Sequence, residues 1–291
     1  MHLPHFEYLA PRSTDELADM LAEHREGSRI LAGGTDLMLQ MLRRDAAPAR
    51  VIDIQHIEAL RRLEYSPESG LEIGALVTIE ELADAEIVRE KYRGLHQGAL
   101  VLGSPQVRAM ATVGGNSCNA SPCADTPPPL IAHGARVNLV SCRGRRSLRL
   151  EEFILDNRAV ALAADEFLES FSVPEPVPGS ASRYEVIGLR NAVEIDLVSV
   201  AVVCAVDAAD GRITHIRVVM GSVAPTPLRA RLAEAELLGR VPTDSAIDLA
   251  GSRCAEESRP IDDLRASAAY RRAALRGLFG RTLRAALAEI A

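Results

Sequence analysis

Apolar and polar positions follow two different periods along the chain, and the changes between them outline the expected elements. Over residues 13–27, apolar side chains recur at helical spacing behind a Ser-Thr capping signature, which predicts a short helix before a glycine. Residues 28–54 read as a short strand, a tight glycine turn, a helix and a second strand, which is a βαβ-like unit. Residues 70–92 predict a strand and a helix capped at Thr78, and residues 95–111 predict another helix.

Residues 112–130 interrupt this pattern with paired glycines, two cysteines and three consecutive prolines, and we expect a long, stiff loop there. A hairpin with its turn at 143–145 and a strand over 165–176 are expected next. The segment 172–182 is rich in proline and serine, so we place a domain boundary in it. Beyond the boundary, two strands joined through an Ala-Asp-Gly hairpin signal precede helical segments that continue to the C-terminus.

Composition narrows the class of protein. A length of 291 residues is typical of two or three compact units. The net charge of −7 argues against a nucleic-acid partner. The N-terminus lacks a secretory signal pattern, and no apolar run approaches the roughly 20 residues that a membrane span needs. We therefore expect a cytoplasmic protein whose five cysteines are reduced thiols.

Two glycine turns are the first candidate site. The stretches LAGGTDL and TVGGN each place a Gly-Gly pair, Gly33–Gly34 and Gly114–Gly115, between an apolar entry and a small polar residue. Paired glycines permit positive φ and let successive N–H groups converge on an anion, so two such turns could share a dinucleotide pyrophosphate. Each pair could equally be an ordinary tight turn. Neither matches the Rossmann glycine spacing or the Walker lysine loop.

The cysteines of the 112–130 segment are the second candidate. Cys118 and Cys123 could supply two metal ligands, with Cys142 or His133 completing a zinc or cluster site. Structural zinc sites usually contain a second closely spaced pair, and the sequence has none. We therefore expect no metal and interpret these cysteines as small packing residues.

Five stretches together resemble one family. LAGGTDLMLQM, TVGGNSCNASPCADTPPPLIAHGA, GLRNAVEIDLVSVAV, MGSVAPTPLRA and PIDDLRASAAYRR occur in that order between Phe6 and about Leu287. The chain resembles the FAD-binding medium subunit of the molybdenum hydroxylase family, which includes xanthine dehydrogenase, carbon monoxide dehydrogenase and 4-hydroxybenzoyl-CoA reductase.

The resemblance implies an α+β fold. Residues 1–175 would form a FAD-binding domain like that of vanillyl-alcohol oxidase, with two α/β subdomains over roughly 1–55 and 56–175. Residues 181–288 would form a C-terminal domain with a three-stranded antiparallel sheet and a helical bundle.

The resemblance also implies the cofactor site, with FAD bound non-covalently. Asp125 would accept a hydrogen bond from a hydroxyl or amide of the cofactor, and Leu168 would be an apolar neighbour of the flavin, with Leu102 as a weaker candidate. Family members often carry a lysine near the flavin where this chain has Val186, so the positive charge there would have to come from elsewhere, such as Arg190. The backbone that would wrap the pyrophosphate belongs to Ala32, Gly33, Gly34, Thr35, Asp36, Leu37, Thr112, Val113, Gly114, Gly115 and Asn116.

The implied function is electron transfer within a larger oxidoreductase. A small iron–sulfur subunit and a large molybdopterin subunit would be the partners, in a doubled heterotrimer. This chain would contribute no catalytic residue for substrate chemistry. It also lacks the cysteine-rich insertion that gives the reductase branch a cluster of its own. The alternatives are a stand-alone flavin oxidase and a non-redox scaffold subunit.

Overall fold

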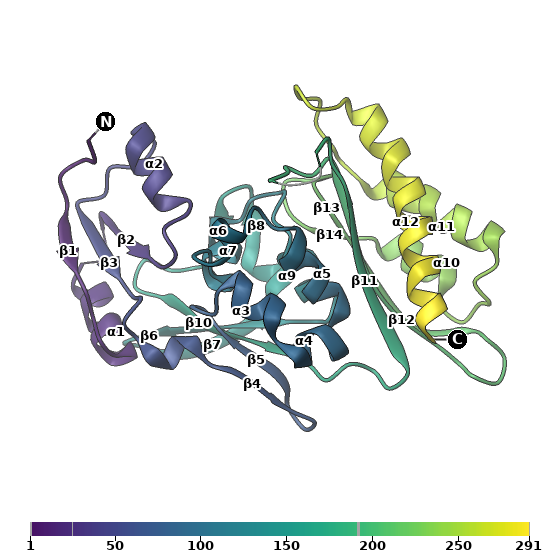
Figure 1. The fold of residues 1–291 in the computed structure, drawn as a ribbon, viewed down its shortest axis with the longest axis horizontal. Coiled ribbons are helices and arrows are strands. Elements are labelled where there is room, and N and C mark those ends of the chain that lie inside the picture. The colour runs from purple at the N-terminus through teal and green to yellow at the C-terminus, as the bar shows by residue number, and fades with distance from the viewer. Residues whose placement is uncertain (1, 25, 191–192, 291) are drawn as a thin grey trace.

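The chain forms three neighbouring parts, each built on its own sheet (Figure 1). The computed structural model describes residues 2–24, 26–190 and 193–290. A small parallel sheet lies at the N-terminal end, a larger antiparallel sheet occupies the centre, and a second antiparallel sheet carries the C-terminal helices. None of the helices in these ranges combines the length and apolarity that a membrane span requires.

The N-terminal part confirms the predicted capped helix and the βαβ unit. Its strands pair in parallel in the order β1-β3-β2. Ser13 caps the first helix, because its hydroxyl accepts a hydrogen bond of 3.1 Å from the N–H of Glu16. The elements are β1 (Glu7–Leu9), α1 (Thr14–Glu23), β2 (Ser28–Leu31), α2 (Leu37–Arg43) and β3 (Arg50–Asp53).

The central part is a five-stranded sheet in the order β4-β5-β10-β6-β7, with short helices packed beside it. The predicted strand over 165–176 is its middle strand and is buried along most of its length. The strands are β4 (Leu63–Ser66), β5 (Gly70–Gly74), β6 (Arg136–Ser141), β7 (Gly144–Arg149) and β10 (Phe167–Val173), and η1 (Glu58–Arg61) precedes them. A small hairpin of β8 (Ile154–Asp156) and β9 (Ala159–Val160) lies beside this sheet.

The prediction of a loop over 112–130 was wrong, because this segment contains two helices, α7 (Val113–Asn119) and α8 (Pro127–Ala132). The hydroxyl of Thr112 caps α7 by accepting a hydrogen bond from the N–H of Gly115. The three prolines occupy the first turn of α8, where a missing N–H costs nothing. Glycine and proline usually end helices, but here they occupy the first turns of α7 and α8, where they are tolerated.

Two predicted helices are each divided in the structure. The capping box at Thr78 is confirmed, but the helix it starts ends at Asp84, because the extended conformation of Ala85 separates it from the next one. Gly103, with a φ of +54°, ends the second predicted helix before Ser104 caps a new one. The resulting helices are α3 (Ile79–Asp84), α4 (Glu86–Lys91), α5 (Arg93–Val101) and α6 (Pro105–Arg108), while α9 (Leu150–Phe153) follows the β6–β7 hairpin. That hairpin turns earlier than predicted, since residues 144 and 145 already belong to β7.

The C-terminal part contains the expected three long antiparallel strands and helices. A two-residue fourth strand extends the sheet at its edge. The segment between the central and C-terminal sheets is shorter than predicted, spanning only 174–179. The elements are β11 (Ser180–Ile187), β12 (Val198–Val206), β13 (Ile213–Gly221), β14 (Leu228–Arg229), α10 (Arg231–Leu237), α11 (Asp244–Glu257) and α12 (Ala268–Ile290).

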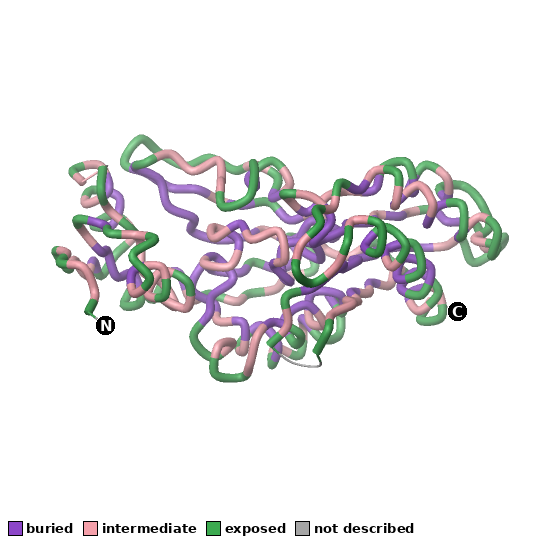
Figure 2. Tube along the Cα trace, turned by 90° about the horizontal axis from the view of Figure 1, so that it is seen from above, coloured by how far each residue is buried: buried purple, intermediate pink, exposed green. Residues whose placement is uncertain are grey.

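Strand β12 joins the two larger parts, because it is buried on both faces. Val200 and Val202 belong to the hydrophobic core shared with α10–α12. Ala201 and Val203 point the other way, into the core that contains α5 and α8. This explains the nearly continuous apolar sequence of the strand. Figure 2 shows these buried segments along the inside of the molecule, with exposed residues on the outer loops and helix faces.

A buried acidic pair lies where these parts meet. The hydroxyl of Tyr184, on β11, donates a hydrogen bond of 2.9 Å to Asp125 and lies 3.5 Å from Asp196. Both carboxyl groups are almost fully buried. Burial raises the pKa of Asp125 to about 6, and burial together with the charge of Asp125 raises the pKa of Asp196 to about 9. The pair therefore retains a proton near neutral pH.

This pair should make the stability of the fold depend on pH. Both pKa values are higher in the folded than in the unfolded chain. The contribution of the protonated pair to the free energy of unfolding is therefore present at low pH and is lost as pH rises through these values. Asp196→Asn removes the titrating group and keeps a neutral polar side chain. We expect the melting temperature of this variant, relative to that of the unmodified protein, to increase as pH rises from 6 to 9. Thermal unfolding followed by circular dichroism measures it.

The matched control is Asp19→Asn, at an exposed aspartate of α1. Its melting temperature should follow that of the unmodified protein across the same pH range. A difference between Asp196→Asn and the unmodified protein that stays constant with pH would contradict proton storage by the pair.

Candidate functional site

The first glycine turn links β2 to α2 and leaves a run of backbone N–H groups free. Gly34 has a φ of +72°, and a Cβ there would lie 3.1 Å from Leu31 Cδ1 and 3.2 Å from Met38 Cγ. Among the described residues, the N–H groups of Gly33, Gly34 and Thr35 find no hydrogen-bond acceptor within the protein. Successive free N–H groups beside a residue of positive φ form a concave site suited to an anion.

The two glycine turns lie against each other through Gly33. A Cβ on Gly33 would fall 1.8 Å from the carbonyl oxygen of Met110 and 3.1 Å from the Cα of Ala111, so only glycine permits this approach. Met110 and Ala111 lead directly into the second turn at Thr112. The fold thus brings together two turns that are almost eighty residues apart, as a ligand with two phosphates would require.

Most N–H groups of the second turn, unlike those of Gly33–Thr35, already donate hydrogen bonds within the protein. Those of Val113 and Gly114 donate to the carbonyl oxygens of Val77 and Ala75, and that of Gly115 donates to Thr112 Oγ1. A Cβ on Gly115 would meet only Thr112 Oγ1, at 2.9 Å. The second turn therefore offers an open backbone surface at Gly115, while free donors come from the first turn.

Side chains connect the helices that follow the two turns. Gln40 on α2 donates a hydrogen bond of 3.5 Å to Asn119 at the end of α7. Asn116, also on α7, accepts a hydrogen bond of 2.7 Å from the hydroxyl of Thr126. These contacts hold the second turn to both the N-terminal part and the start of α8.

The other predicted residues of the first turn occupy different environments. Ala32 packs against the hydrophobic core of the N-terminal part. Asp36 is exposed and precedes α2 without capping it through its side chain, and Leu37 is the first residue of that helix. The exposed position of Asp36 allows its carboxylate to remain in water while its backbone faces the turn.

Asp125 and Leu168 are both buried. Asp125 belongs to the acidic pair and is oriented by Tyr184. Leu168, on β10, and Leu102, after α5, belong to the same hydrophobic cluster as Val113 of the second turn. All three therefore belong to the hydrophobic core of the central part.

Arg190 lies in the connection between β11 and β12 with an exposed side chain. Its guanidinium lies 3.6 Å from the carboxylate of Glu194 and donates a hydrogen bond to the carbonyl of Val193. Val186, at the position where the family often has lysine, is partly buried against the central core. The neighbouring residues 191 and 192, part of one of the stretches used above, lie outside the described residues.

The cysteines of the segment are thiols in apolar surroundings. Burial raises the pKa of the Cys118 thiol to about 12 and raises the pKa of Cys123. No cluster of three or more histidine, cysteine, aspartate or glutamate side chains suited to a metal ion occurs in the described ranges. With raised pKa values these thiols are poor nucleophiles at neutral pH.

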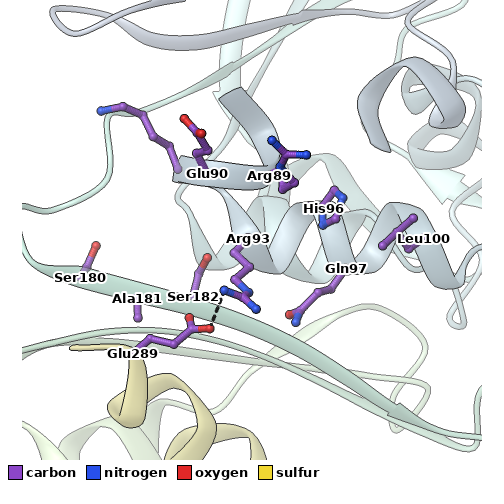
Figure 3. Close-up of a pocket in the computed structure, with 11 residues that line it drawn as sticks. Arg89, Glu90, Arg93, His96, Gln97, Leu100, Ser180, Ala181, Ser182 and Glu289 are labelled. Atoms are coloured by element: carbon purple, nitrogen blue, oxygen red, sulfur yellow. Dashed lines mark ion pairs between the residues drawn. The ribbon is translucent and has the colours of Figure 1, made fainter. Parts of the chain in front are cut away.

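A groove of about 850 Å³ opens elsewhere, between α4–α5 and β11 (Figure 3). Its cationic side chains already have partners, since Arg93 lies 2.9 Å from Glu289 and Lys91 lies 2.6 Å from Glu175. None of the predicted cofactor residues lines it. We therefore place the candidate site at the paired glycine turns.

Tyr184 and Asp196 are the residues that sequence reasoning missed. Asp196 stands next to an otherwise apolar strand, in the stretch EIDLVSV, and a lone carboxylate at such a position was the available signal. Tyr184 had no comparable signal, because its contact with Asp125 joins positions 59 residues apart.

Two family models together match most of the chain. Residues 4–176 match the model of the FAD binding domain in molybdopterin dehydrogenase. Residues 182–286 match the model of the CO dehydrogenase flavoprotein C-terminal domain.

Individual relatives match over most of their length. The carbon monoxide dehydrogenase medium chain of Hydrogenophaga pseudoflava is 31% identical over 99% of both chains. The putative xanthine dehydrogenase FAD-binding subunit of Escherichia coli is 30% identical over 79% of each chain. A solved carbon monoxide dehydrogenase structure from Hydrogenophaga pseudoflava superposes with a TM-score of 0.95 at 33% identity, covering 100% of both chains.

The free N–H groups of the first turn, its backbone contact with the second, and matches over the whole chain lead to one conclusion. The chain belongs to the FAD-binding flavoprotein family of the molybdopterin dehydrogenases and is an oxidoreductase subunit.

Proposed function

We propose that this chain is the electron-transfer subunit of a multi-subunit molybdenum-containing hydroxylase or dehydrogenase. It would pass electrons between iron–sulfur clusters of a partner subunit and an external acceptor. The observation that carries the proposal is the run of free N–H groups at Gly33–Thr35 lying against the second glycine turn. Bound FAD supplies the exchange between one-electron and two-electron transfer.

The residues around the turns fit the pyrophosphate of FAD. The free N–H groups of Gly33, Gly34 and Thr35 would donate to phosphate oxygens, helped by the N-terminal end of α2. Gly115 would let the cofactor approach the second turn, where most N–H groups already donate within the protein. The remaining backbone of 32–37 and 112–116 would complete the wrapping.

Asp125 and Leu168 would contact the cofactor beyond the phosphates. A carboxylate facing phosphate would repel it, so Asp125 would accept a hydrogen bond from a hydroxyl or amide on the ribose side. Tyr184 holds that carboxylate in place. Leu168 would lie beside the flavin. Arg190 would provide the nearest positive charge, weakened by its pairing with Glu194.

We also propose the division of labour in the complex. Residues 1–175, with subdomains 1–55 and 56–175, would bind FAD, and residues 181–288 would form the second domain. A small iron–sulfur subunit would deliver electrons, and a large molybdopterin subunit would carry the substrate chemistry, in a cytoplasmic doubled heterotrimer. The large subunit, and not this chain, would therefore determine the organic substrate.

Exposed apolar side chains at one end of the C-terminal part support a protein partner. Leu189 and Ile195 are exposed before β12, and Ile261 and Leu264 are exposed before α12. Arg271 connects these two segments, because it donates hydrogen bonds to Leu197 O and to Asp263 Oδ1. Exposed apolar groups gathered in this way are typical of protein interfaces.

Substitution of the glycines tests the phosphate assignment. Gly34→Val forces a branched side chain into a φ of +72°, and Gly115→Val fills the open surface of the second turn. We expect either change to weaken FAD binding by about 5- to 150-fold, because the strain or lost contact amounts to about 1–3 kcal/mol. Absorbance at the flavin bands relative to protein measures FAD content.

Gly277→Ala is the control, since a Cβ there meets nothing within 4 Å. It should retain the FAD content of the unmodified protein, and circular dichroism should show that all three variants are folded. Full FAD content in either valine variant would rule out the pyrophosphate assignment for that turn.

Purification from the native organism tests the partners. A tagged chain should co-purify with a small iron–sulfur subunit and a large molybdopterin subunit, and metal analysis of the complex should find iron and molybdenum. Isolation of a lone flavoprotein that reduces oxygen with a small organic donor would instead support a stand-alone oxidase and overturn the subunit proposal.

A further inference from the structure

A second cavity, of about 200 Å³, lies where the central and C-terminal parts meet. It is separate from the glycine turns. The ends of β6 and β7 contribute Arg136 and Arg149, and β13 and β14 contribute Arg217 and Arg229. Among the described residues, Glu151 is the one carboxylate that lines it. Four guanidinium groups thus surround a small space in a chain whose net charge is −7.

The cavity has more positive than negative charge even after its internal pairs are counted. Arg229 lies 2.8 Å from Glu234, and Arg149 lies 3.4 Å from Glu151. Glu151 is also shared with Arg231, at 3.6 Å. Each carboxylate at this place therefore already faces at least one arginine.

Arg217 is the arginine without a partner. Among the described residues its guanidinium forms no ion pair and no side-chain hydrogen bond, although the residue is half-buried. Burial and the neighbouring charge of Arg229 lower its pKa. Arg217 faces the charges of Glu234 and Glu151 without pairing directly with either, so its donors remain available to an anion in the cavity.

The backbone is shaped around this guanidinium. Gly134 has a φ of +78°, and a Cβ there would fall 2.1 Å from Arg217 Nη1. Glycine at this position therefore leaves room for the arginine head group at the mouth of the cavity. Burial and the charge of Arg217 also lower the pKa of the adjacent His133 to about 3, so that histidine stays neutral.

We propose that this cavity is an anion site, distinct from the FAD site, that binds a phosphate group. The planar donor forks of several arginines match the tetrahedral oxygens of phosphate, and the cavity has room for one such group with attached water. The phosphate is either the free ion or the head of a small phosphomonoester. Bound there, it bridges arginines of the central part to arginines of the C-terminal part and stabilises their junction.

Calorimetric titration of the FAD-loaded full-length chain tests the proposal. FAD fills the glycine turns, so added phosphate cannot bind there and its binding reports on the arginine cavity. The probes are inorganic phosphate and glucose 6-phosphate at constant ionic strength. We expect one phosphate group to bind per chain and to raise the melting temperature. The probe that binds more tightly, inorganic phosphate or glucose 6-phosphate, shows whether the site prefers the free ion or the ester.

Arg217→Gln should weaken phosphate binding by about tenfold or more, because charge-assisted hydrogen bonds are lost. Arg217→Lys, which keeps the charge and much of the packing, should give an intermediate affinity. Arg272→Gln, at an exposed arginine of α12, is the control and should bind as the unmodified chain does. FAD content should be unchanged in all three.

Absence of binding by both probes to the unmodified chain would overturn the proposal. Equal binding by Arg217→Gln and the unmodified chain would do so as well. FAD content and phosphate affinity are measured separately. A chain that lacks FAD but binds phosphate through Arg217 would contradict the FAD assignment and support the anion site.

Discussion

The contact between Gly33 and the carbonyl of Met110 is the constraint on which the candidate site depends. A Cβ at Gly33 would overlap that oxygen at 1.8 Å, so glycine alone lets the N-terminal βαβ unit approach the backbone before Thr112. This approach places the free N–H groups of the first turn beside the open surface of the second. Neither turn has both features by itself, and the function of the site therefore arises from their packing.

The central and C-terminal parts are held together by a second constraint, the strand β12. One face fills the core of the C-terminal part and the other fills the central core, so the two parts cannot separate without exposing the central core to water. The same junction contains the Tyr184–Asp125–Asp196 cluster and the arginine cavity. A buried acidic cluster and a partly exposed group of arginines thus lie at the same junction.

Much of this architecture could be predicted from local sequence. The helix caps at Ser13 and Thr78, the parallel βαβ unit and the β12–β13 hairpin follow from nearby residues, and the structure confirms them. The two helices within 112–130 could not be predicted from the abundance of glycine and proline, because the position of those residues in a first turn decides their effect. The contacts of Tyr184 and the unpaired state of Arg217 depend on distant segments, which local patterns do not encode.

Release of the cofactor from the purified chain tests the central assignment most directly. In the proposed assignment the two glycine turns would bind FAD through free N–H groups and close backbone approach, without a covalent bond. Acid denaturation should therefore release intact FAD in an amount equal to the protein, and mass spectrometry should find the polypeptide unmodified. A flavin mass that remains on the polypeptide, or a folded chain with no flavin, would contradict the assignment.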